Sequence, residues 1–187
     1  MNKEIKKAMK ELNKELENLL TDKNQLPSKS IDKITDKIYL GDVEGTEDLN
    51  YFSQEKITHV LSLIDLDPKY ITISFPADSN IIHKTVPISD EENFSLFKYL
   101  KECIEFIENS NKIYIHCMCG ISRSPSIVIA YLMWKTHFNY YDTYFFVKNR
   151  RKFISPNDGF VKQLLLFKKI LEENNYDLNK IDFNKIN

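Results

Sequence analysis

His116-Cys117-Met118-Cys119-Gly120-Ile121-Ser122-Arg123-Ser124 is the most informative part of this sequence. It places a cysteine and an arginine with five residues between them, directly after the apolar run Ile113-Tyr114-Ile115. That run is short, β-favouring and preceded by the turn residues Asn109-Ser110-Asn111, so it predicts a buried strand. The residues from about Ser124 to Thr136 are apolar on most faces and predict a buried helix. The quoted residues therefore lie on a loop between a strand and a helix.

A loop of this kind is suited to binding an anion such as phosphate. Several of its backbone N–H groups can point inward, and the following helix contributes its unpaired donors and its dipole. Gly120 permits a close backbone approach or a positive φ, and Ser122 adds a hydroxyl. Arg123 supplies a planar fork for two phosphate oxygens. In such surroundings we expect Cys117 to be a thiolate that attacks a phosphate monoester, and the departing alkoxide then requires a general acid.

The residues around this loop resemble the signature of the dual-specificity protein phosphatases, within the superfamily of cysteine-dependent tyrosine phosphatases. The resemblance covers the chain from about Ile31 to Leu171. It rests on HCMCGISRS, its continuation Pro125–Met133, the upstream runs Ile38–Gly41 and Ile57–Leu63, and the closing segment Arg151–Phe160 with Gln163-Leu164. The two upstream runs are similar to the opening strand of the family and the strand that follows it.

The resemblance implies an α/β fold. It is a three-layer, dual-specificity phosphatase-like fold in which helices flank a central mixed sheet of about five strands, with the Cys-x5-Arg phosphate loop between a strand and a helix. The alternation of strands and helices along the chain also predicts an α/β layer sandwich. Within it, the pattern from Tyr141 to Asn149 predicts a helix. Ser155-Pro156 is expected to begin another, with serine as N-cap and proline at the first helical position.

The resemblance also selects the general acid. Asp90 falls where the family places this residue, and we therefore prefer it to Glu91 and Glu92. Two other interpretations of Asp90 are an ordinary turn aspartate and the N-cap of the helix that follows. The stretch from Asp90 to Cys117 is a few residues shorter than is common in the family, and the register of the intervening helix places the deletion near residues 108–111.

By the same resemblance, the reaction has two steps. Cys117 attacks phosphorus while Asp90 protonates the leaving oxygen, and Arg123 with the loop amides stabilises the phosphoryl charge. Deprotonated Asp90 then activates the water that hydrolyses the cysteinyl-phosphate, Ser124 stabilises the leaving thiolate, and His116 orients the cysteine by hydrogen bonding. Neither a metal nor another cofactor is expected, because Arg123 and the amides supply the electrostatic stabilisation. The substrate-binding phosphate loop comprises Met118, Cys119, Gly120, Ile121, Ser122 and Arg123.

Each proposed catalytic residue also has a purely structural interpretation. Cys117 would be a buried core thiol and Arg123 a solvated arginine at a helix start, although the complete motif favours catalysis for both. His116 would be a strand-end residue bonded to backbone, and Ser124 an N-cap.

The other cysteines and histidines carry a weaker chemical signal. A disulfide between Cys119 and Cys117 would be strained, and for Cys119 and Cys103 structural roles are favoured over redox roles. The remaining histidines, His59, His83 and His137, lack metal-ligand spacing.

Composition predicts a soluble intracellular domain. The chain has 187 residues, 42% of them hydrophobic, which is enough for one sizeable core, and its net charge of -1 gives no reason to expect nucleic-acid binding. Three cysteines argue against a disulfide framework, and a reactive thiol suits a reducing compartment. We find no signal peptide and no apolar run long enough to span a bilayer, so no membrane association is expected. The expected location is the cytoplasm, with or without the nucleus.

The chain divides into three expected parts. Residues 1–30 form a charged helical extension and linker, residues 31–174 the catalytic domain, and residues 175–187 a loose polar tail. The apolar residues of the extension have helical spacing, which favours a cap on the domain over partner docking or self-association, so we expect a monomer or weak self-association through this helix. Near the end of the domain, the basic cluster Lys148, Arg150, Arg151 and Lys152 is interpreted as a solvated helix end rather than as an attraction site for phosphorylated substrate.

The loop chemistry favours a phosphorylated protein as substrate. Between Cys117 and Arg123 the loop carries no lysine or further arginine. Family members that act on phosphoinositides tend to place basic residues there, and related RNA triphosphatases end the motif differently. The expected partners are phosphorylated proteins, with a protein kinase as one candidate. A shallow pocket would admit phosphoserine and phosphothreonine, although phosphotyrosine should react fastest because phenolate leaves more easily than alkoxide. The alternatives are a phosphate-binding adaptor without turnover and a phosphoinositide or RNA phosphatase.

Overall fold

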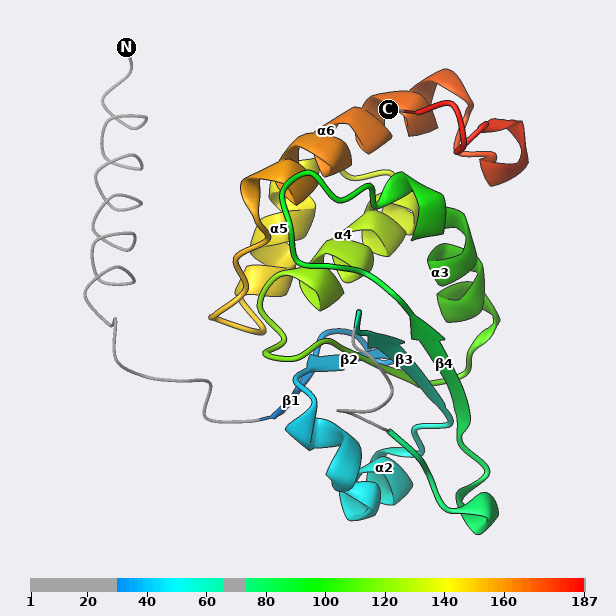
Figure 1. The fold of residues 1–187 in the computed structure, drawn as a ribbon, viewed down its shortest axis with the longest axis vertical. Helices are drawn as coiled ribbons and strands as arrows, with labels where there is room; N and C mark the ends of the chain where they lie inside the picture. The colour runs from blue at the N-terminus through cyan, green and yellow to red at the C-terminus, as the bar shows by residue number, and fades with distance from the viewer. Residues whose placement is uncertain (1–29, 66–72, 187) are drawn as a thin grey trace, which may run out of the picture.

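A computed structural model describes residues 30–65 and 73–186 of the chain (Figure 1). The predicted N-terminal helix and its linker lie outside the described residues, and so does self-association through that helix. None of the helices in the described ranges is long and apolar enough to cross a membrane.

The centre of the fold is a five-stranded mixed sheet with the strand order β1-β2-β5-β3-β4. β1 runs antiparallel to β2, and the other neighbouring strands are parallel. The strands are β1 (Ile31–Lys33), β2 (Ile38–Gly41), β3 (His59–Leu63), β4 (Ile82–Val86) and β5 (Ile113–His116). β2 and β5 are buried along their whole length, as expected for parallel strands that are covered on both faces.

Helices cover both faces of this sheet, which gives three layers (Figure 1). One face is covered by α2 (Leu49–Glu55), whose Phe52 packs with Val60 of β3 and Tyr114 of β5. The remaining helices lie on the other face, namely α3 (Phe97–Asn109), α4 (Arg123–Thr136), α5 (Tyr140–Lys148) and α6 (Asp158–Glu173). The predicted three-layer α/β fold with about five strands is confirmed.

The central helix of the second layer is α4, and its sequence explains that position. Its residues from Ser124 to Met133 are all buried, so no polar stripe faces water. It contacts α3, α5 and α6 on its sides, and β2 and β5 beneath it. Because β5 leads into α4 through a short loop, that loop lies at the carboxyl end of the central strand, where parallel α/β sheets bind ligands.

Three predicted elements are confirmed, and one expected helix start is wrong. The strand at 113–115, the helix at 124–136 and the helix at 141–149 correspond to β5, α4 and α5 within one residue at each end. Ser155-Pro156 does not begin a helix: α6 begins at Asp158, and the side chain of Asn157 caps it by accepting from Phe160 N at 2.9 Å.

The C-terminal segment is not loose up to residue 186. Leu178, Ile181 and Phe183 are buried against the main core, and Phe183 lies against Phe167 of α6 with ring centroids 6.3 Å apart. The carbonyl of Tyr176 also accepts a hydrogen bond from Trp134 Nε1 at 2.9 Å. The predicted domain boundaries near residues 31 and 174 stay a prediction.

Candidate active site

The loop after β5 is held in place by hydrogen bonds that other residues donate to its backbone carbonyl groups. The carbonyl of Met118 accepts from Val43 N at 3.1 Å, and that of Ile121 accepts from Ser155 N at 2.7 Å. The carbonyl of Ser122 accepts from both the amide and the hydroxyl of Ser126, at 3.1 and 2.7 Å. In a trans peptide the C=O and the following N–H point to opposite sides. Anchoring these carbonyls outward therefore turns the following N–H groups toward the inside of the loop.

Two further carbonyls of the loop are held by Arg151. Its Nε donates to the Gly120 carbonyl at 2.9 Å and its Nη2 donates to the Cys119 carbonyl at 3.2 Å. The same guanidinium pairs with Asp32 at 2.8 Å and lies 3.9 Å from a carboxylate oxygen of Asp42. Arg151 is only 1% exposed, so its interpretation as part of a solvated basic cluster is wrong. The side chain belongs to the framework of the loop.

Gly120 is required by the backbone of this loop. It has a φ of 65°, and a Cβ at this position would lie 2.4 Å from the Gly41 carbonyl oxygen and 2.5 Å from Arg151 Nη2. The sequence-based expectation of positive φ or close approach is met in both respects.

Cys117 lies at the base of the loop and is 1% exposed. The hydroxyl of Ser124, in the first turn of α4, donates to its sulfur at 3.3 Å. Since α4 begins at Arg123, Ser124 lies inside the helix and is not its N-cap. The helix N-terminus, the inward N–H groups and this hydroxyl all favour a bound anion at this point.

Arg123 extends over the same site. Its Nη1 lies 3.5 Å from the carbonyl of Leu63, the last residue of β3. It lies 3.4 Å from the carbonyl of Ile88, which is in the segment after β4. Its Nε is buried and has no hydrogen-bond partner among the described residues. A buried donor of this kind costs free energy unless an acceptor reaches it, and a phosphate oxygen would be such an acceptor.

Asp90 lies next to the loop, on the segment between β4 and α3. Its Oδ1 accepts from the Ser122 hydroxyl at 2.6 Å and from Asn157 Nδ2 at 3.0 Å. Its Oδ2 lies 3.6 Å from Arg123 Nε. Asp90 is not a helix N-cap, because α3 begins later, at Phe97. The structure thus brings Asp90 to the arginine and the hydroxyl of the loop.

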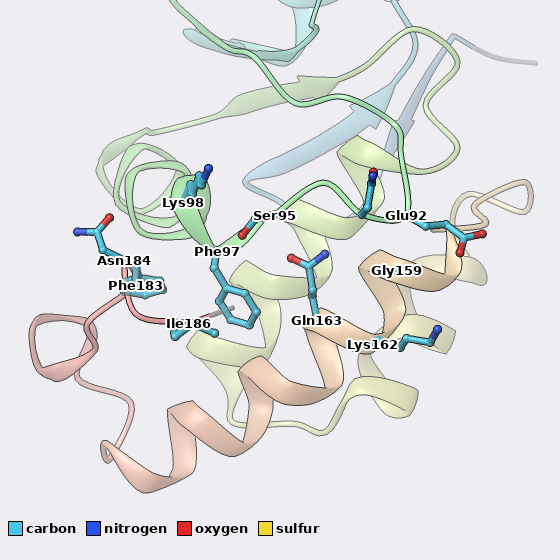
Figure 2. A pocket seen from close by; sticks show the side chains of 11 residues that line it. Glu92, Ser95, Phe97, Lys98, Gly159, Lys162, Gln163, Phe183, Asn184 and Ile186 are labelled. Carbon is cyan, nitrogen blue, oxygen red and sulfur yellow. The ribbon is translucent and has the colours of Figure 1, made fainter.

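The segment that carries Asp90 is fixed against the start of α6. Gln163 accepts from Leu96 N at 2.7 Å and donates to the Phe94 carbonyl at 2.8 Å. Figure 2 shows Gln163 pointing from α6 toward this segment. A Cβ on Gly159 would lie only 1.8 Å from the Glu92 carbonyl oxygen, so glycine is needed for this close approach.

A hollow of about 650 Å³ lies behind the Asp90 segment rather than at Cys117 (Figure 2). Its described lining comes from the segment after Asp90, α3, α6 and the C-terminal residues 183–186, not from the cysteine loop. The candidate active site is therefore identified by the anchored loop carbonyls and the side chains around Cys117, and not by the volume of the hollow.

His116 contacts the loop from the end of β5. It is fully buried, and its Nδ1 lies 3.2 Å from the Cys117 carbonyl oxygen. Burial lowers the pKa of His116 to about 4, and the nearby His83 and Arg123 act in the same direction, whereas the backbone hydrogen bond to Cys117 opposes them. His116 is therefore neutral at physiological pH.

The remaining cysteines differ in their surroundings. Cys119 is exposed, and Cys103 is fully buried in the core, where burial raises the pKa of its thiol. Within the described ranges, no group of three His, Cys, Asp or Glu side chains is arranged to hold a metal ion.

Sequence reasoning did not assign site roles to Arg151 or Asn157. Asn157 contacts both Asp90 and Ser122, whose hydroxyl accepts from Asn157 N at 3.2 Å. Arg151 and Asn157 lie in the closing segment of the family resemblance, which was the available signal for both. Their partners are more than 30 residues away in sequence, so local patterns could not identify them.

A Cys-x5-Arg loop at the carboxyl end of a central parallel strand, with an aspartate beside it, is the arrangement of a cysteine-dependent phosphatase. The family model described as "Dual specificity phosphatase, catalytic domain" matches residues 38–170. The chain belongs to the dual-specificity phosphatase family.

Similar proteins include a "Putative tyrosine phosphatase 123R" of Invertebrate iridescent virus 6, 33% identical over 76% of this chain and 95% of the viral protein. "Dual specificity protein phosphatase 9" of Homo sapiens is 32% identical over 74% of this chain. The chain spans only 36% of that human protein and 37% of the similar "Dual specificity protein phosphatase MPK-4" of Drosophila melanogaster.

Solved structures give the same result. The human "tyrosine phosphatase-like serine/threonine/tyrosine-interacting protein" superposes with a TM-score of 0.71 and 28% identity, covering 76% of this chain and 97% of the human one. The crystal structure of DUSP15 superposes with a TM-score of 0.64 and 30% identity, covering 76% and 95% of the two chains.

Proposed function

We propose that this chain removes phosphate from phosphotyrosine, phosphoserine and phosphothreonine side chains of proteins through a cysteinyl-phosphate. The observation that carries the proposal is the anchoring of consecutive loop carbonyls away from Cys117, which directs the loop amides toward a bound phosphoryl group. Oriented amides and a guanidinium stabilise phosphoryl oxygens without having to reorganise during the reaction.

In the first step the Cys117 sulfur attacks phosphorus. The S–P bond forms as the P–O bond to the leaving group breaks, and Asp90 transfers its proton to the departing oxygen. The Arg123 fork and the inward amides bind the three non-bridging oxygens. Arg123 Nε, which makes no hydrogen bond with the described residues, gains an acceptor at this point.

In the second step a water molecule attacks the phosphoryl group of the intermediate. Asp90, now deprotonated, takes the proton of that water, and the S–P bond breaks to return the thiolate. The Ser124 hydroxyl, 3.3 Å from the sulfur, stabilises the thiolate as it leaves. Inorganic phosphate is the product.

A protein substrate with one phosphate at the site is supported by the charges of the loop. Its side chains Met118, Cys119 and Ile121 are uncharged, and the one buried arginine beside it, Arg151, is occupied by loop carbonyls and by Asp32. An inositol ring with several phosphates would need further cations near the rim. We also propose the cytoplasm, with or without the nucleus, as the location and a protein kinase as one candidate partner.

The test compares tyrosine, serine and threonine phosphopeptides with phosphoinositides, using Cys117→Ser as the control for the nucleophile. We expect peptide turnover that is fastest for phosphotyrosine and is abolished in Cys117→Ser. Normal turnover by Cys117→Ser would refute the nucleophile assignment, and faster turnover of a phosphoinositide would refute the substrate class.

A phosphate-binding adaptor is the second candidate, because one similar human structure is named as an interacting protein. Binding of the same phosphopeptides without release of phosphate would favour this candidate.

A further inference from the structure

A hydrogen-bonded chain of three side chains crosses the sheet and ends at the cysteine loop. Ser62 Oγ lies 2.7 Å from His116 Nε2 and 2.7 Å from His83 Nε2. His116 Nδ1 lies 3.2 Å from the Cys117 carbonyl oxygen. The three residues come from β3, β4 and β5, and Ser62 is directly opposite His116 in the register of β3 and β5. The chain therefore joins a half-buried histidine of β4 to the backbone of the candidate nucleophile.

The donor and the acceptor of each hydrogen bond can be assigned by starting from the Cys117 carbonyl. A carbonyl oxygen only accepts, so the hydrogen bond to Cys117 requires a proton on His116 Nδ1. His116 is neutral, which leaves its Nε2 as an acceptor, and the Ser62 hydroxyl must donate to it. Ser62 has then used its one proton, so it accepts from His83 Nε2–H. In this arrangement each of the three hydrogen bonds has one donor and one acceptor.

We propose that Ser62 and His83 are positioning residues that hold His116 in the neutral tautomer protonated at Nδ1, and through it fix the Cys117 peptide in the orientation that serves catalysis. This inference rests on the proposed function of the site, since the orientation matters only if the loop amides bind a phosphoryl group. The carbonyl of Cys117 is the first of the loop carbonyls held outward, and its anchoring turns the Met118 N–H inward.

Around these three hydrogen-bonded side chains, the described residues offer few other hydrogen-bond partners. The ring of Phe75 lies edge-on to His83 with centroids 5.2 Å apart, and Tyr114 stacks on His116 at 5.4 Å. The Thr85 hydroxyl lies 3.4 Å from His83 Nε2, a longer contact than that of Ser62. Lys84, the neighbour of His83, instead pairs with Glu102 of α3 at 2.8 Å. Among the described residues, the titratable groups that act on His116 are His83 and Arg123.

The direct test is nitrogen NMR of the histidine rings in the full chain, which has four histidines. The two ring nitrogens of a neutral imidazole differ strongly in chemical shift, and a His116→Asn spectrum assigns the signals. We expect His116 to be protonated at Nδ1 and His83 at Nε2. A His116 protonated at Nε2 could not donate to the Cys117 carbonyl and would overturn the inference. This measurement needs no turnover.

Variants then test the link to the reaction. Ser62→Ala removes the donor to His116, and we expect a mixture of His116 tautomers with a roughly fivefold lower kcat/KM for an aryl phosphate. His83→Leu should give a smaller loss, which His83→Gln should reverse because its amide can donate to Ser62. Thr85→Val is the matched control and should change neither readout.

The outcomes separate this inference from the proposed function. An unchanged tautomer and an unchanged kcat/KM in folded Ser62→Ala would overturn the positioning role. An active Cys117→Ser would instead overturn the proposed function while leaving the tautomer result intact.

Discussion

The buried side chain of Arg151 donates to the carbonyl oxygen of Gly120 at 2.9 Å, which joins the segment before α6 to the middle of the phosphate loop. The same guanidinium reaches the Cys119 carbonyl and Asp32 of β1. One arginine thus connects the edge strand of the sheet to the loop at its centre, and the loop's orientation depends on residues that take no part in the chemistry.

Replacing Arg151 should damage both stability and activity. Arg151→Met leaves Asp32 and two loop carbonyls without their buried partner, so we expect a loss of about 3 kcal/mol in the free energy of unfolding. Arg151→Lys keeps the charge but lacks the fork that reaches both carbonyls, and should lower kcat/KM for an aryl phosphate with a smaller loss of stability. Urea unfolding and steady-state kinetics measure the two effects. Lys152→Met, at an exposed neighbouring position, is the control, and an equal effect there would contradict the account.

Gly159→Ala should displace Asp90, the proposed general acid, without changing a residue of the cysteine loop. The added Cβ would meet the Glu92 carbonyl at 1.8 Å, so the segment that carries Asp90 must move. Because a displacement of about 1 Å costs on the order of a hundredfold in rate, kcat for phenyl phosphate should fall by that order. Turnover of p-nitrophenyl phosphate, whose leaving group needs less protonation, should fall much less. Asp158→Ala is the matched control, and equal losses for both substrates would show that Gly159 acts elsewhere.

The stability of the fold should decrease as the pH falls from 6.5 toward 4. His116 has its pKa lowered from the ordinary 6.5 to about 4 by burial, so in this window the unfolded chain binds the proton and the folded chain does not. The contribution of His116 is fully present above pH 6.5 and is lost as the pH falls through the window, by about 2 kcal/mol between pH 7 and pH 5. Burial lowers the pKa of His83 as well, which adds to the same trend.

Urea unfolding of the chain and of His116→Asn at both pH values isolates this contribution. The difference in stability between pH 7 and pH 5 should be smaller in the variant. An identical pH dependence in both proteins would contradict the burial of a neutral His116.

The cysteines should differ in their reactivity. Cys119 is exposed and should react with iodoacetamide in the folded protein, whereas Cys103 should react only after unfolding because burial both hides its thiol and raises its pKa. Mass spectrometry of peptides before and after urea treatment measures this. Rapid modification of Cys103 in the folded protein would contradict this expectation and support a redox role for Cys103.

Much of the fold and the core of the site could be predicted from local sequence. The β5–loop–α4 unit is continuous, so Cys117, Gly120, Arg123 and Ser124 take their positions from one stretch of chain. The position of Asp90 required the family resemblance, because it reaches the loop through an ion pair and hydrogen bonds to Arg123, Ser122 and Asn157 that no local pattern specifies.

The wrong expectations share a physical cause. Arg151 belongs by sequence to a basic cluster, and Ser155-Pro156 has the composition of a helix start. Tertiary contacts determine the outcome instead. Arg151 donates to the loop carbonyls, and Ser155 N donates to the Ile121 carbonyl. Asn157 is the N-cap of α6. The polar C-terminal segment is similarly fixed by a few apolar residues, Phe183 among them.

If phosphate passes through the Cys117 sulfur, a cysteinyl-phosphate can be trapped during turnover. The chain and its Asp90→Asn variant are mixed with p-nitrophenyl phosphate, quenched in acid and examined by mass spectrometry. We expect one phosphoryl group on the peptide that contains Cys117, with more of it in Asp90→Asn because hydrolysis of the intermediate is slowed. Release of p-nitrophenol with no phosphoryl group on that peptide, or with the group on another residue, would contradict the account.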